Sequence, residues 1–202
     1  MDALLSSTYF GPVQWYQCLC RHDRVLIEQH DTYRKQTYRN RCVIATAQGA
    51  QALTVPVVHH AGATIADVLI SDHGNWRHQH WQAITSAYGD SPFLEYYEDD
   101  IRPFFTEHRW ERLLDFNEDI RQKMCELLDI RPQVSLTTAY RHSGQLDADT
   151  ADLREAILPK ATPPRFTPQP YYQVFAARHG FMPGMSILDL LLNMGPEAIF
   201  YL

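Results

Sequence analysis

The start of the chain constrains its fold most, because strand and helix patterns alternate within the first 33 residues. A β-rich run over 4–11 ends in a Gly-Pro turn, and residues 13–22 then carry apolar side chains at helical spacing. A second β-rich run follows over 24–33. Strand, helix and strand in so short a segment predict a βαβ unit with two parallel strands.

The rest of the chain predicts further elements around this unit. Two β-rich runs flank Gln48-Gly49-Ala50, which is typical of a hairpin. The other elements that we expect are strands over 64–71 and 133–140 and helices over 76–89, 92–108, 109–129 and 186–202, the last broken near Gly195-Pro196. The fold class predicted is α/β (mixed α+β), with an opening βαβ unit, a mixed sheet, a β-hairpin and flanking helices.

Length and proline content set the expected organisation. A chain of 202 residues has room for one sizeable core, so we expect a single domain over 1–202. Prolines 159, 163, 164, 168 and 170 crowd one segment. Because proline lacks a backbone donor and disfavours helix before it, we expect a loop or lid over about 141–170. A connector without function is the alternative.

Charge and cysteine content exclude several classes of protein. The net charge of -6 argues against a nucleic-acid partner, which usually meets a basic domain. Four cysteines without a CxxC pair indicate a reduced, cytoplasmic protein. The first residues lack the pattern of a signal peptide, and no stretch approaches the ~18 apolar residues of a membrane span.

The segment 33-YRKQTYRNR-41 concentrates positive charge in this acidic chain. In an extended strand, Lys35, Arg39 and Arg41 would share one face, because strand side chains alternate. Their mutual repulsion would be offset by a bound anion, and arginine pairs well with phosphate or carboxylate. Asn40 lies among them, and the segment therefore predicts an anion site. The alternative is a charged edge strand that guards against aggregation.

The expected helix over 76–89 carries a second candidate site. Trp76 and His80 lie four residues apart on one face, and Arg77 follows Trp76. Histidine can act as an acid or a base near neutral pH, so Arg77 and His80 are functional candidates. The alternative, favoured for the tryptophans, is that the face simply packs into the core.

Other polar groups point to no metal or cofactor. Histidines 59, 60, 73, 78 and 80 lie close together but lack the spacing of zinc ligands, and we expect no metal site. The run 95-EYYEDD-100 reads as a solvated face. Neither a Walker A motif nor a GxGxxG motif occurs, so the sequence identifies no cofactor.

Near the C-terminus, Asp189 and Asn193 lie four apart on a helix that is otherwise apolar, with Ser186 placed to cap its start. A polar pair in such a setting is either a buried hydrogen-bond network or part of a site, and the sequence leaves both open.

Several stretches in order resemble the WbqC-like family. They are YFGP-x-QWY, Tyr-Arg-Asn-Arg, LTVPV, ADVLIS, NWR-x-x-HW, AYG-x-SPF-x-EYYED, LLDFN and SILDLLLNMGPE. The matching positions include Tyr9, Asn117 and Gly195. Two features depart from longer members. Where those start with a His-Gln-Pro-x-Tyr stretch, this chain reads Ser7-Thr8-Tyr9-Phe10-Gly11-Pro12, with no His, and the segment 141–170 replaces a Gly-rich loop.

The resemblance implies a bacterial protein of surface-polysaccharide (O-antigen-like) precursor metabolism. We expect an enzyme that transfers an acyl, aminoacyl or nucleotidyl group on an activated sugar, with an anionic small molecule such as a nucleotide, nucleotide-sugar or acyl donor as its partner. A non-catalytic ligand-binding or scaffold protein of the same pathway is the alternative, and a homo-oligomer is compatible with either. The expected catalytic residues are His80, Asp189 and Asn117, and the expected ligand-binding residues are Tyr9, Lys35, Arg39, Asn40, Arg41, Trp76, Arg77 and Asn193.

Overall fold

The opening βαβ unit forms as the sequence predicts. In the computed structural model, which describes residues 1–107, 109–159 and 167–202, strand β1 (Asp2–Ser6) leads through helix α1 (Val13–Arg21) to β2 (Val25–Glu28). The two strands are parallel, with Ala3 opposite Val25 and Ser6 opposite Glu28. The expected strand over 24–33 is thus shorter than its β-rich run.

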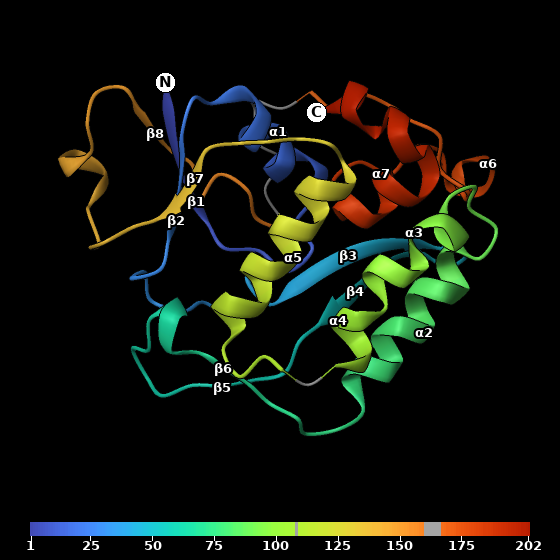
Figure 1. Ribbon diagram of the computed structural model, residues 1–202, viewed down its shortest axis with the longest axis horizontal. Helices are drawn as coiled ribbons and strands as arrows, with labels where there is room; N and C mark the ends of the chain where they lie inside the picture. Colours follow the sequence, from blue (N-terminus) through green and yellow to red (C-terminus); the bar gives the residue numbers. More distant parts are fainter. Residues whose placement is uncertain (108, 160–166) are drawn as a thin grey trace.

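Two later strands complete a parallel sheet around this unit (Figure 1). Strand β7 (Val134–Leu136) pairs with β2, and β8 (Thr150–Asp152) pairs with the other edge of β1. The resulting order is β7-β2-β1-β8, so the chain passes from one side of β1 to the other between β7 and β8. Open parallel sheets usually bind ligands at the point where the order of the strands changes direction in this way.

The antiparallel strands lie in separate two-stranded sheets. Strands β3 (Arg41–Thr46) and β4 (Gly49–Thr54) form the expected hairpin, with Gly49 at φ +107. Strands β5 (Val57–Val58) and β6 (Leu69–Ile70) form a second, short pair, preceded at β6 by the 3₁₀ helix Ile65–Asp67. The α/β fold class is confirmed, with parallel and antiparallel strands kept apart rather than joined in one sheet.

The helices gather mainly around the hairpin. Figure 1 shows α2, α3 and α4 beside β3 and β4, away from β7 and β8. The helices have these bounds: α2 Trp76–Tyr88, α3 Leu94–Ile101, α4 Pro103–Thr106, α5 Leu113–Leu127, α6 Ala176–His179 and α7 Ile187–Met194. The expected helix over 92–108 is divided at Pro103, and residue 108 lies outside the described part of the chain. Gly195 ends α7 at φ +55, and a 3₁₀ helix over Gly195–Tyr201 follows, which confirms the expected break.

One hydrophobic core joins the sheet to the helices in a single domain. On one face of the sheet, Ala3, Leu5, Val25 and Ile27 are almost fully buried in this core. Successive strand residues point to opposite faces, so Leu4 and Leu26 lie on the other face. None of the helices in the described ranges has the length and apolar character needed to cross a membrane.

That other face of the sheet is covered by a segment without an α-helix. Residues 138–149, here called the strap, run between β7 and β8 and contain the 3₁₀ helix Ser143–Gln145. Within the segment 141–170, expected to be a loop, the structure thus places this turn and strand β8. The sequence of Thr150–Asp152 contains no β-rich run. Such a run is typical of buried strands, whereas this edge strand is only half-buried. Pro163 and Pro164 lie outside the described residues.

The basic segment does not form the strand that the sequence predicts. Residues 34–40 turn sharply, and Gln36 adopts a φ of +60, in the left-handed region that interrupts any strand. Lys35 is exposed, Arg39 is buried and Arg41 is half-buried at the start of β3. The expectation that these three side chains share one face is therefore wrong.

Candidate functional site

Polar residues follow each strand at the carboxyl edge of the parallel sheet. Ser6 ends β1, Glu28 ends β2, Thr137 follows β7, and Asp152 ends β8 just before Arg154. The carboxyl ends of parallel strands meet at one edge, so residues distant in sequence come together there. This edge and the sheet face beside it form the candidate site.

A buried ion network holds this edge together. Glu28 Oε1 accepts hydrogen bonds from the Thr137 hydroxyl and the His30 amide, both at 2.8 Å. Its Oε2 lies 3.4 Å from Nη1 of Arg154, a side chain that is also buried. Arg154 makes a two-point contact with Asp152, with Nε–Oδ1 at 2.9 Å and Nη2–Oδ2 at 2.7 Å. This contact lowers the pKa of Asp152 to about 2.

A second buried arginine lies beside the first. Arg39 Nη2 donates to Asp31 Oδ2 at 2.5 Å and to the Ser6 hydroxyl at 2.9 Å. Ser6 in turn donates to the carbonyl of Arg154 at 3.2 Å, so it joins the two arginine networks. Asn117 donates to the carbonyl of Arg39 at 2.8 Å. The guanidinium of Arg39 is therefore used within the protein, rather than presented to an anion in solvent.

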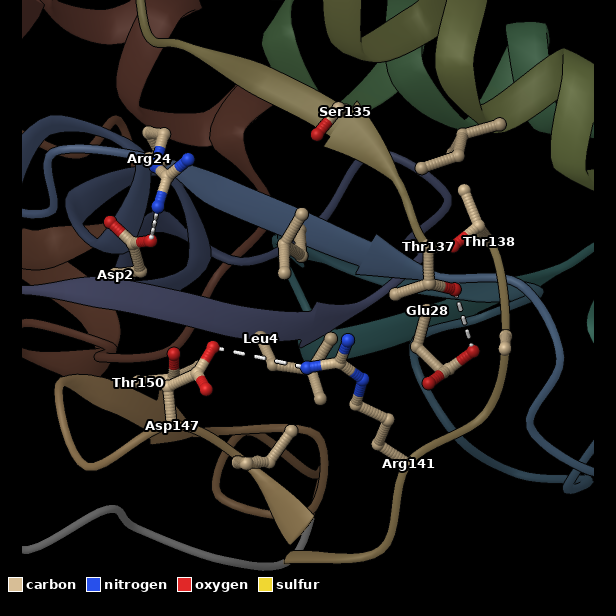
Figure 2. Close-up of a pocket in the computed structure, with 14 residues that line it drawn as sticks. Asp2, Leu4, Arg24, Glu28, Ser135, Thr137, Thr138, Arg141, Asp147 and Thr150 are labelled. Atoms are coloured by element: carbon tan, nitrogen blue, oxygen red, sulfur yellow. Dashed lines mark hydrogen bonds and ion pairs between the residues drawn. The ribbon is translucent and has the colours of Figure 1, made fainter.

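A cavity of about 460 Å³ opens between the strap and the sheet face that the strap covers (Figure 2). Its volume falls in the range of small-molecule sites. Leucines on the strands form its apolar floor, and hydroxyl groups, carboxylates and two arginines surround them. The lining residues are Asp2, Leu4, Arg24, Leu26, Glu28, Ser135, Leu136, Thr137, Thr138, Ala139, Arg141, Leu146, Asp147 and Thr150.

The cations of this cavity are paired with carboxylates. Arg24 Nη2 lies 2.6 Å from Asp2 Oδ2, and Arg141 Nη1 lies 3.8 Å from Asp147 Oδ2. Figure 2 shows the Arg141 side chain extending from the strap across the cavity, near Leu4. Carboxylates and guanidinium groups thus alternate around an apolar floor, an arrangement that offers acceptors and donors to a hydroxylated ring.

The usual anion position of a βαβ unit, at the start of its helix, is filled by the chain itself. The amide of Val13 donates to the carbonyl of Met185 at 3.0 Å, and Pro12 forms an isolated bridge with Ser186. Ile187 donates to the carbonyl of Gly11 at 2.8 Å. The segment before α7 therefore covers the start of α1, where a phosphate would otherwise find free amides.

Four of the expected site residues meet in a second, closed cluster. Tyr9 and Nδ1 of His80 are hydrogen-bonded at 2.9 Å, with both side chains buried. The Trp76 ring contacts His80 edge-on, and the Arg77 guanidinium lies 4.4 Å from the Trp76 ring centre. Arg77 also pairs with Asp72. Burial lowers the pKa of His80 to about 4, so its imidazole is neutral near pH 7.

A third cluster surrounds Asp189 and Asn193. The carboxylate of Asp189 accepts from the hydroxyls of Tyr88 at 2.9 Å and Tyr171 at 2.7 Å, and from Gln173 Nε2 at 2.7 Å. Asn193 donates to the carbonyl of Asp189 and accepts from the amide of Val174. Burial raises the pKa of Asp189. Of the two readings that the sequence left open, the geometry is that of a buried network tying the segment 171–174 to α7.

The remaining expected residues stay apart from these clusters or support the backbone. Asn40 donates to the carbonyl of Val55 at 2.8 Å. Arg41 Nε contacts the Thr54 hydroxyl at 3.2 Å. In the described part of the chain, no hydrogen bond joins His80 to Asp189 or Asn117. The three expected catalytic residues therefore lie in three different hydrogen-bond groups.

Sequence reasoning missed the cavity and the network at its end. No sequence motif includes the residues that form them, because each stands alone among ordinary polar residues. These residues are Glu28, Thr137, Arg141 and Arg154. One signal was available, since a polar side chain follows each strand of the parallel sheet. This signal can be recognised only when β7 is known to lie beside β2 and β8 beside β1.

Comparison with known proteins adds a family and a distant relative. The sequence model of the WbqC-like protein family matches residues 7–160. An uncharacterised protein of Mycobacterium tuberculosis strain H37Rv, Rv1507c, is 26% identical over 223 residues, an alignment that covers 99% of this chain and 96% of the relative. No solved structure matches the chain significantly.

Proposed function

Because the chain belongs to the WbqC-like protein family, we propose that it is an enzyme of bacterial surface-polysaccharide precursor metabolism. It transfers an acyl, aminoacyl or nucleotidyl group on an activated sugar that binds between the strap and the parallel sheet. The observation that carries this proposal is the cavity of about 460 Å³ along the sheet face, beside the point where the strand order reverses.

The lining of the cavity matches the chemistry of a sugar. The half-buried Leu26 offers an apolar surface to one face of a pyranose ring, next to the buried side chain of Leu4. Thr150 and Ser135 carry hydroxyls that exchange hydrogen bonds with ring hydroxyl groups. A nucleic-acid strand would instead require a run of unpaired cations, which this lining lacks among the described residues.

Within this proposal, Glu28 supports the site from inside the protein, because its side chain is fully buried. Its Oε1 accepts two short hydrogen bonds, whereas its Oε2 has only the longer contact with Arg154. Both oxygens thus have partners within the protein, and Glu28 positions Thr137 and Arg154 at the end of the cavity. His80 and Asp189 do not line this cavity, and the proposal gives them supporting roles in place of the expected catalytic ones.

The experiment that tests the proposal fills the cavity and follows ligand binding. Ser135→Trp places a bulky ring against the cavity, and Gln51→Trp adds the same ring to an exposed position of β4 outside it. The purified protein is screened by thermal shift against sugar phosphates, nucleotide-sugars and acyl-coenzyme A. Ligand at about 100 times its dissociation constant stabilises the fold by about 2.7 kcal/mol.

We expect a sugar-bearing class to stabilise the native protein and Gln51→Trp, but not Ser135→Trp. Incubation of that sugar with acyl, aminoacyl and nucleotidyl donors, followed by mass spectrometry, then identifies the group transferred. Equal binding by both tryptophan variants would place the ligand elsewhere, and binding without any product would favour a non-catalytic role.

A scaffold protein of the same pathway is the second candidate, and one observation favours it. Tyr96, Ile199 and Phe200 are large apolar side chains that remain exposed around the end of the chain. Tyr171 does not add to an exposed apolar surface, because its side chain is buried beside Asp189. If this candidate is right, Tyr96→Glu and Phe200→Glu abolish the binding of a partner protein and leave sugar binding intact.

A further inference from the structure

The two arginines that line the cavity and Arg154 beside it differ in how tightly their carboxylate partners hold them. Arg24 lies 2.6 Å from Asp2, and Arg154 makes two bonds of 2.9 Å or less with Asp152. Arg141 lies 3.8 Å from Asp147, and no hydrogen bond of its guanidinium is present among the described residues. Arg141 is thus the cavity's loosely held cation.

The position of Arg141 suits a ligand that already occupies the cavity. Its side chain leaves the strap and crosses the opening near Leu4, toward Asp147 and Thr150 (Figure 2). A guanidinium group binds a phosphate or a carboxylate through two parallel hydrogen bonds, a better geometry than its present contact. Exposed ion pairs of this kind contribute little, so an incoming anion replaces Asp147 at small cost.

We propose that the cavity takes a sugar with a single anionic substituent, either a sugar monophosphate or a sugar acid. The anion binds Arg141 in place of Asp147, and the ring lies over Leu4 and Leu26. This inference rests on the proposed function and narrows its substrate. The carboxylates of Asp2 and Asp147 also line the cavity, and they oppose any second anionic group beyond the one that Arg141 binds, such as the second phosphate of a nucleotide-sugar.

Two substitutions of opposite sign test the proposal. Arg141→Ala removes the cation, whereas Asp147→Asn removes the carboxylate that competes for it. We expect the first to weaken binding of glucose 1-phosphate or glucuronate by about tenfold or more. The second should strengthen it severalfold. A purely structural ion pair would give two changes of the same sign, because either substitution breaks it equally.

The chain provides a matched control. Arg131 Nη2 lies 3.9 Å from Asp129 Oδ1, and both side chains are at least as exposed as those of the Arg141–Asp147 pair. Arg131→Ala and Asp129→Asn lie outside the cavity and should leave every affinity unchanged. Calorimetry at low salt compares glucose 1-phosphate, glucuronate, glucose, inorganic phosphate and UDP-glucose across the variants.

The outcomes separate this inference from the proposed function. If glucose and glucose 1-phosphate bind with equal affinity and Ser135→Trp abolishes the binding of both, the sugar site stands but the role of Arg141 is overturned. Tighter binding of UDP-glucose than of glucose 1-phosphate would overturn the single-anion class. Inorganic phosphate that binds as well as the sugar phosphate would overturn the ring position, and no binding of any sugar would sink both proposals. A preference between glucose 1-phosphate and glucuronate identifies which anion the cavity takes.

Discussion

The hydroxyl of Tyr9 and Nδ1 of His80 are hydrogen-bonded at 2.9 Å, between two side chains that are both buried. The pair joins the loop after β1 to helix α2 across 71 residues of sequence. It is therefore a contact of the fold rather than of an open site.

The burial of His80 predicts acid sensitivity. Its pKa of about 4 lies below the ordinary value of 6.5, so the unfolded chain takes up the proton more readily. Its contribution to stability is complete above pH 6.5 and is lost as the pH falls toward about 4, by on the order of 3 kcal/mol. Urea unfolding across this range measures the loss. His80→Gln should flatten the profile, and an unchanged slope in that variant would assign the sensitivity to other groups.

The Asp189 network predicts a structural effect without loss of ligand binding. In Asp189→Asn, an amide NH₂ replaces one of the oxygens that accept from Tyr88, Tyr171 and Gln173. One of these donors is left unsatisfied, which costs about 1–3 kcal/mol in the free energy of unfolding. Hydrogen exchange should rise in residues 171–174, while the cavity binds its ligand as before. Lost binding with normal exchange would return Asp189 to the catalytic role expected from sequence.

Arg154, which follows β8, and Arg141 of the strap predict unequal costs when they are replaced. Arg154→Met leaves the buried carboxylate of Glu28 without its cation, which destabilises the protein by on the order of 3 kcal/mol. Arg141→Met breaks an exposed pair and should cost less than about 1 kcal/mol. Chemical denaturation of both variants gives the comparison. Similar losses would mean that Glu28 is reached by water or rearranges without Arg154.

The break after α7 predicts a strict need for glycine. Gly195 has a φ of +55, and a Cβ there would lie 2.5 Å from a ring carbon of Phe93. Gly195→Ala should therefore destabilise the fold by about 2 kcal/mol or more. At Gly144 an added Cβ meets no atom within 4 Å, so Gly144→Ala should change stability by no more than about 0.5 kcal/mol. Thermal unfolding distinguishes the two, and equal midpoints would show that Phe93 moves aside freely.

Local patterns in the sequence determined much of the fold. The opening βαβ unit, the hairpin around Gly49, helix α2 and the broken C-terminal helix were all predicted, because each depends on the period of apolar residues and on nearby glycine or proline. The resemblance to the WbqC-like family also came from sequence, and the family model confirms it. These features need no knowledge of which distant segments meet.

Tertiary structure alone decided the candidate site. Whether Arg39 faces solvent or Asp31 depends on a turn at Gln36 and on the burial of the guanidinium, which the alternation of charges in the sequence does not encode. The cavity exists because β7 and β8 flank β2 and β1, and because the strap rather than an α-helix crosses the sheet face. The physical reason is that strand order and the burial of charge arise from contacts between residues about a hundred or more positions apart, such as Glu28 with Arg154.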